Sequence, residues 1–133
     1  MREDYDERDL EDELTKHITL LLLELSKGFS FCGWQVELVV SGTSYRIDML
    51  FYHIRLKCYV VVELKNHAFQ PEYVGKLNFY ITAVDKLLKQ EEDNPAIGLL
   101  ICKTKDETKV EWAFNGINKP LGVAAYEINS PPL

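Results

Sequence analysis

The sequence has few cysteines and no long apolar run. Cys32, Cys58 and Cys102 are widely spaced and form no Cys-x-x-Cys pair, so we expect reduced core thiols and neither disulfides nor a zinc site. The longest apolar runs, Leu20–Leu23 and Cys58–Val62, are far shorter than the ~20 residues that cross a bilayer. The N-terminus is acidic and lacks the apolar stretch of a signal peptide. The sequence therefore predicts a cytoplasmic protein with no membrane span.

An excess of positive charge is also missing. The net charge of −6 arises within residues 1–14, where eight acids stand against two arginines, and the other residues balance 13 acids with 13 bases. This neutral body excludes binding to nucleic acid mainly through a strongly basic surface, but it leaves nucleic-acid binding open. A chain of 133 residues is long enough for one domain with its own core. We expect a single domain over residues 1–133, with a loose acidic leader at 1–6 and a loose tail at 129–133.

Hydrophobic periodicity predicts the order of the elements. Apolar residues at helical spacing predict helices over about residues 7–27, 71–90 and 106–115. Alternating or continuous apolar segments predict strands near residues 36–40, 45–53, 58–65, 96–102 and 121–128. Three successive strands favour an antiparallel meander, and the later strand–helix–strand passages favour parallel pairing. We expect an α/β fold in which helices flank a mixed sheet, with an αβββαβ core followed by a further helix and strand.

Three ionisable residues interrupt the apolar strands. Asp48 lies inside the second predicted strand, and Glu63 and Lys65 end the third. If residues 54–57 form the hairpin loop, counting back from the loop places Asp48 directly opposite Glu63, with Cβ atoms ~4.5–5.5 Å apart. Lys65 shares that face because side chains alternate along a strand. The sequence therefore predicts that two carboxylates and an amine converge on one patch.

Two carboxylates this close repel each other unless a cation lies between them. Their oxygens, with the backbone carbonyl of Leu64 and water, are suitable ligands for Mg²⁺ or Mn²⁺. A metal held there can activate water and stabilise charge on a phosphodiester, and Lys65 can orient the water or offset charge. The alternative is a cross-strand ion pair between Lys65 and Glu63, with Asp48 solvated at the strand end.

The pattern of Asp48 followed by Glu63-Leu64-Lys65 resembles the signature of the PD-(D/E)XK nuclease superfamily. Several longer stretches resemble, in order, the C-terminal nuclease domain of YhcG-type bacterial proteins, and the likeness covers about residues 7–128. These stretches are Leu25–Phe31, Ile47–His53, Cys58–Lys65, Pro71–Tyr80, Asp93–Gly98 and Lys119–Val123. The resemblance implies a restriction-endonuclease-like fold.

The resemblance also implies an activity and the residues that perform it. It implies an Mg²⁺- or Mn²⁺-dependent deoxyribonuclease, an endonuclease that hydrolyses phosphodiester bonds of DNA. Asp48, Glu63 and the Leu64 carbonyl would bind the metal, and Lys65 would be the catalytic lysine. A catalytically inactive nucleic-acid-binding or assembly module of the same fold is the alternative function.

Further residues follow from the family pattern. Many members of the superfamily complete the site with an acid from the first helix, for which Glu11 is preferred over Glu24. The alternative for either residue is a place on the solvated face of that helix. Related nucleases also carry Gln-x-x-x-Tyr on the helix after the catalytic lysine, where this chain has Lys76 and Tyr80 as supporting residues. Lys76 thus replaces an amide with a cation. Gln35 could line a groove, but nothing in the sequence fixes the direction of its side chain.

The resemblance also implies two expectations about partners. Small nucleases of this kind often need two active sites to cut two strands, which favours a homodimer. YhcG-type proteins normally carry another N-terminal domain, so the expectation is that this chain is a fragment or a stand-alone version. In the first case a DNA-binding domain or a partner protein would supply part of the DNA contact.

Overall fold

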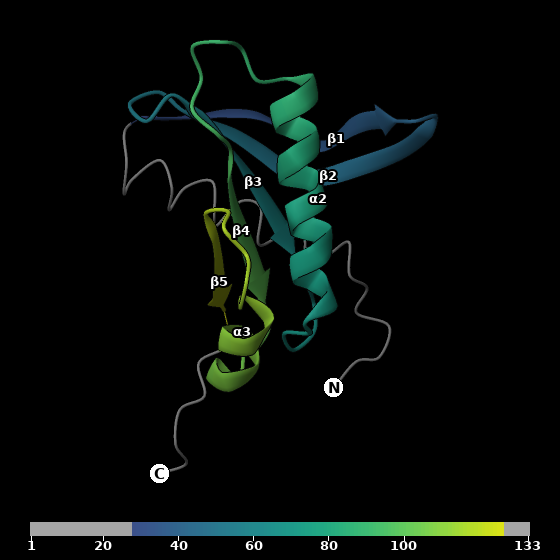
Figure 1. Cartoon of the computed structure of the whole chain (residues 1–133), viewed down its shortest axis with the longest axis vertical. Helices are drawn as coiled ribbons and strands as arrows, with labels where there is room; N and C mark the ends of the chain where they lie inside the picture. The colour runs from purple at the N-terminus through teal and green to yellow at the C-terminus, as the bar shows by residue number, and fades with distance from the viewer. Residues whose placement is uncertain (1–27, 127–133) are drawn as a thin grey trace.

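The structure, a computed structural model, describes residues 28–126, which form a five-stranded sheet and two helices (Figure 1). The elements are β1 (Phe29–Val40), β2 (Thr43–His53), β3 (Cys58–Leu64), α2 (Glu72–Leu87), β4 (Ile97–Cys102), α3 (Glu107–Ala113) and β5 (Leu121–Ala125). The predicted helix over 7–27, the leader and the tail lie outside the described residues. In the part of the chain that is described, neither helix has the length and apolar character needed to cross a membrane.

The strands are arranged in the sheet in the order of the sequence, β1-β2-β3-β4-β5. β1, β2 and β3 pair antiparallel, whereas β4 joins β3 in parallel and β5 joins β4 in parallel. The predicted mixed sheet is therefore confirmed, with α2 and α3 as the two crossover helices. The first strand is longer than predicted, since its pairing with β2 begins at Phe29 and continues to Val40.

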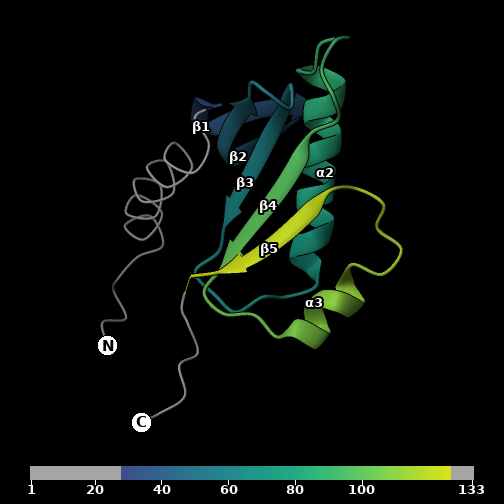
Figure 2. The same ribbon diagram turned by 90° about the vertical axis from the view of Figure 1, so that its left-hand side faces the viewer.

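Each face of the sheet carries a separate hydrophobic cluster. α2 runs along one face (Figure 2), and its buried residues pack there with Val61 of β3 and Leu100 of β4. Residues of α3 and of the segment that follows it pack against the same cluster. Val60, Val62 and Leu64 of β3 belong to the cluster on the opposite face. Because side chains alternate along a strand, Glu63 shares the face of Val61, beneath α2.

The loop after α2 supports the register of the β2–β3 hairpin. The N–H of Asn94 donates to the Lys57 carbonyl at 2.7 Å, and its side-chain amide donates to the Leu56 carbonyl at the same distance. The Tyr52 hydroxyl also donates to Asp93 Oδ1 at 2.5 Å. These contacts satisfy polar groups of the hairpin loop and fasten it to a second element, so a slip of the two strands would break them together.

One expectation about the cysteines is wrong. Cys58 and Cys102 are buried free thiols, as expected of core residues, but Cys32 is exposed. Cys32 lies in β1, which among residues 28–126 is an edge strand of the sheet and pairs with a neighbouring strand on one side only. A cysteine is a small hydrophobic residue by composition alone, and its position at the edge is a property of the topology.

Gly98→Ala should lower the free energy of unfolding by about 1–3 kcal/mol, the usual cost of overpacking a core. A Cβ at Gly98 of β4 would lie 2.4 Å from Ile81 Cδ1 and 2.9 Å from Leu121 Cδ2. Gly75→Ala is the matched control, because a Cβ there meets nothing within 4 Å. In a helix interior this second change should raise stability by about 0.5–1 kcal/mol. Urea unfolding measures both, and equal effects would contradict the packing described.

Candidate active site

The β2–β3 hairpin has the register predicted from the sequence. Its pairs run from His53 opposite Cys58 to Met49 opposite Val62, with residues 54–57 as the loop. Asp48 and Glu63 are next in this register, immediately beyond the last backbone pair. The structure therefore brings the two predicted acids to the same level of two neighbouring strands.

The carboxylates themselves replace the backbone pairing at this level. The N–H of Asp48 donates to Glu63 Oε2 at 3.0 Å, and the N–H of Leu64 donates to Asp48 Oδ2 at 2.8 Å. Each acid thus accepts a hydrogen bond from the main chain of the opposite strand. This reciprocal arrangement fixes the positions of both side chains relative to the sheet.

Burial makes ionisation of both acids unfavourable. Glu63 is 3% exposed and is the one charged side chain that is fully buried among residues 28–126. Burial raises the pKa of Glu63 to about 8, and the charge of Asp48 contributes in the same direction. Burial also raises the pKa of Asp48, against the hydrogen bond from Leu64 and the charge of Lys65. The pair therefore lies where an additional positive charge would be strongly favourable.

Two lysines supply part of that positive charge. The ammonium of Lys65 lies 5.1 Å from the centre of the Tyr73 ring, and that of Lys76 lies 5.7 Å from the centre of the Tyr80 ring. Both lysines lower the pKa of Glu63, although burial outweighs them. Within the described residues, Lys65 forms no ion pair with Glu63 inside 4 Å. The arrangement is therefore not the simple ion pair that the sequence allowed as the alternative.

Tyr80 lies beside the two acids, in the core beneath α2. Its side chain is buried, and burial together with the nearby charges of Glu63 and Asp48 raises its pKa to about 12. The phenol consequently stays protonated and neutral. Lys76, one turn earlier on α2, is exposed, and its charge lowers the pKa of both Asp48 and Glu63. The structure thus brings both predicted supporting residues of α2 to the site.

One contact at the site was not predicted from the sequence. The side-chain amide of Gln35 in β1 donates to Asp48 Oδ1 at 3.3 Å. No motif marks Gln35, since a lone glutamine in a strand carries no chemical signature. Its direction follows from the pairing of β1 with β2, which only the structure gives.

The donor set fits a hard divalent cation. Burial raises the pKa of both carboxyl groups, and the charge of Asp48 raises that of Glu63 further, so the pair is a suitable binding site for Mg²⁺ or Mn²⁺, which prefer oxygen ligands. Residues 28–126 contain no group of three His, Cys, Asp or Glu side chains that could hold a metal. A third acid would have to come from elsewhere, and the predicted Glu11 lies outside the described residues. The Leu64 carbonyl and water are the other predicted ligands.

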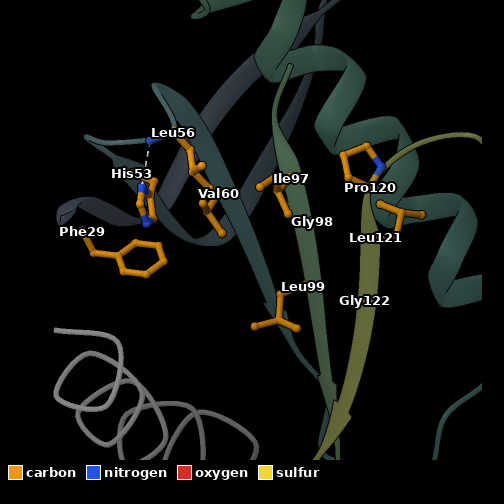
Figure 3. Close-up of a pocket in the computed structure, with 10 residues that line it drawn as sticks. All are labelled: Phe29, His53, Leu56, Val60, Ile97, Gly98, Leu99, Pro120, Leu121 and Gly122. Carbon is orange, nitrogen blue, oxygen red and sulfur yellow. Dashed lines mark hydrogen bonds between the residues drawn. The ribbon is translucent and has the colours of Figure 1, made fainter. Parts of the chain in front are cut away.

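A pocket on the opposite face of the sheet has a different character. Its lining is largely apolar and includes Phe29, Val60 and Leu99 (Figure 3). His53 also borders it, and His53 Nδ1 accepts a hydrogen bond from the N–H of Leu56 at 3.1 Å. None of the predicted site residues lines this pocket. The two predicted acids therefore lie away from this pocket, on the face that α2 covers.

Comparisons with known proteins show which sequences and folds this chain resembles. The family described as YhcG PDDEXK nuclease domain matches residues 1–132. A protein of Escherichia coli (strain K12), named "Putative nuclease YhcG", is 30% identical over 131 residues, which are 98% of this chain and 35% of that protein. This chain therefore spans about a third of the length of its curated relative.

Solved structures show the same fold. A repair endonuclease from Pyrococcus abyssi matches with a TM-score of 0.56 and 18% identity, over 98% of this chain and 50% of that one. EndoMS in its apo form matches with a TM-score of 0.53 and 20% identity, over 99% of this chain and 49% of that one. EndoMS in a complex with double-stranded DNA matches with a TM-score of 0.53 and 17% identity, over 98% and 51%.

Proposed function

Because the chain belongs to the family of YhcG PDDEXK nuclease domains, we propose that it hydrolyses phosphodiester bonds of DNA with the help of Mg²⁺ or Mn²⁺. The proposal rests chiefly on one observation, the pair of buried Glu63 and half-buried Asp48 with two lysines beside it. Two acids that face each other away from water destabilise a fold unless a cation, a bound proton or hydrogen bonds offset the cost. The resemblance seen in the sequence is confirmed at the level of the family.

Asp48, Glu63 and the Leu64 carbonyl would hold the metal. When bound, the metal supplies Lewis acidity, which promotes ionisation of water and stabilises negative charge on the phosphate. The reciprocal main-chain hydrogen bonds hold both carboxylates in place before substrate arrives. This preorganisation means that little rearrangement is needed during the reaction.

Lys65 would be the catalytic lysine. Its ammonium lies over the ring of Tyr73, beside the carboxylates but not paired with Glu63, so it remains available to water or to a phosphate oxygen. It would orient the attacking water and offset the charge that develops on the phosphate. Tyr80 would support Glu63 as a neutral neighbour.

Lys76 gives this site a second cation where related nucleases have an amide. The lysine is exposed on α2 and contributes to the field at both carboxylates. We propose that it contacts a phosphate of the DNA backbone, because a compact ammonium at an open position is suited to that contact. Such a contact positions the substrate without reading its sequence.

The wider setting is also a proposal. We propose that residues 1–133 form one nuclease domain that acts in the cytoplasm, where the thiols of Cys58 and Cys102 remain reduced. We propose that two copies associate to cut both strands of a duplex. A further DNA-binding domain or a partner protein would extend the contact with DNA, since this chain spans only 35% of its curated relative.

The test is a cleavage panel of linear, nicked, branched and single-stranded DNA, each with Mg²⁺, Mn²⁺ or a chelator. We expect cleavage of at least one DNA form with either metal, and none with the chelator. Calorimetric titration with Mn²⁺ should show binding that disappears in Asp48→Asn, because that change removes a charged ligand. If the chain binds DNA but neither cleaves it nor binds Mn²⁺ near millimolar concentration, the inactive binding module would be the correct function.

A further inference from the structure

Gln35 has an unusual backbone in the middle of β1. Its φ is 54°, in the left-handed region that few residues other than glycine adopt. β1 pairs with β2 through Trp34 opposite Met49 and Val36 opposite Ile47, and the level between these two pairs, which holds Gln35 and Asp48, is missing from the ladder. Strained backbone of this kind persists only where its surroundings require it, and it clusters at functional sites.

The strained residue coincides with a change of face along β2. Ile47 packs in the cluster beneath α2, whereas Met49 packs in the cluster on the opposite face. In a regular strand these two residues would share one face. The side chains of β2 therefore change face at this level, and Asp48 lies at the point of change with Gln35 of β1 beside it.

The Gln35 side chain points at the proposed metal ligand. Its amide donates to Asp48 Oδ1 at 3.3 Å, while the N–H of Leu64 donates to Oδ2 at 2.8 Å. Both oxygens of the carboxylate are thus held, one from each neighbouring strand. Because each carboxylate oxygen has two lone pairs, one donor per oxygen leaves capacity for a cation.

We propose that Gln35 is a positioning residue of the metal site, which orients Asp48 through its amide and is aimed there by its strained backbone. The inference rests on the proposed function and adds to it a residue outside the motif of Asp48, Glu63 and Lys65. Partners that orient a metal ligand typically contribute 10- to 100-fold in metal affinity or activity. The strained backbone at Gln35 then lowers the stability of the fold, and in return it directs the amide at Asp48.

Two variants of Gln35 separate the amide from the strained backbone. Gln35→Met keeps the length of the side chain but cannot donate, so we expect Mn²⁺ affinity and kcat to fall about 10- to 100-fold while KM for DNA stays unchanged. Gln35→Gly should lose the same activity and unfold at a higher urea concentration, because glycine adopts positive φ without strain. Ser41→Gly is the matched control: Ser41 also has a positive φ, 50°, but lies exposed in the β1–β2 turn. It should raise the urea midpoint and leave cleavage unchanged.

A third measurement tests the contact without cleavage. Urea unfolding of Gln35→Met, Asp48→Asn and the double variant should give non-additive changes, as expected of residues in contact. Additive changes would overturn the inference, as would a Gln35→Met protein with wild-type Mn²⁺ affinity and kcat, and the proposed function would stand in both cases. A wild-type chain that neither binds Mn²⁺ nor cleaves DNA would contradict the proposed function, and the inference with it.

Discussion

Lys65→Ala should lower the rate of metal-dependent DNA cleavage by about 100- to 1,000-fold and leave the fold intact. This is the usual effect of removing one group that stabilises charge in a transition state. The side chain of Lys65 is only partly buried, and its ammonium contacts the Tyr73 ring. Truncation therefore removes little packing, so the loss should be catalytic.

Metal binding distinguishes this role from a merely structural one. Lys65 lowers the pKa of both Asp48 and Glu63, so its positive charge competes with any cation bound between them. Without this charge, Mn²⁺ should bind more tightly, although cleavage is lost. Lys86→Ala in the last turn of α2 is the control, an exposed lysine outside the site, and it should match the wild type. Wild-type cleavage by Lys65→Ala would refute the catalytic assignment.

Much of the site could be predicted because it depends on one hairpin. The loop over residues 54–57 sets the register, and the period of two along a strand then places Glu63 and Lys65 relative to Asp48. These rules act between neighbours in sequence. The apolar pattern likewise predicts the order of strands and helices, since local periodicity and short connections determine it.

The remaining features depend on contacts between distant segments. The direction of Gln35 follows from a positive φ and a missing level of pairing, and neither has a signature in the residue types. The exposure of Cys32 follows from the position of β1 at an edge. The anchoring of the hairpin by Asp93 and Asn94 joins residues about 40 positions apart, which sequence patterns do not reveal.

Glu63→Gln should abolish Mn²⁺ binding and DNA cleavage, yet it should stabilise the metal-free protein at pH 8. The pKa of Glu63 is about 8 in the folded chain, against an ordinary value of 4.5. Below pH 4.5 both states hold the proton, and this residue adds no pH dependence. Between pH 4.5 and 8 the folded state keeps a proton that the unfolded state has released, so stability falls as the pH rises. The glutamine side chain of the variant is neutral at every pH and escapes this loss.

Bound Mn²⁺ should reverse the order of stability of the wild type and Glu63→Gln. In chelator at pH 8, the variant should exceed the wild type by a few kcal/mol in free energy of unfolding, and the difference should shrink to less than about 1 kcal/mol near pH 5. Millimolar Mn²⁺ should then stabilise the wild type and not the variant, because only the intact pair binds it. Cleavage should fall by more than the 10- to 100-fold typical for a partner of a ligand.

Urea unfolding at pH 5 and pH 8, with and without Mn²⁺, measures these effects in one set of curves. Glu92→Gln, an exposed acid in the loop after α2, is the matched control and should behave as the wild type does. If the wild type and Glu63→Gln changed in stability by the same amount from pH 5 to pH 8 in chelator, Glu63 would not be held as a buried acid. Equal stabilisation of both proteins by Mn²⁺ would place the cation elsewhere. The reversal identifies a ligand, because such a glutamate lowers the stability of the metal-free protein and raises that of the Mn²⁺-bound protein. A glutamate with a structural role would change the stability of both forms in the same direction.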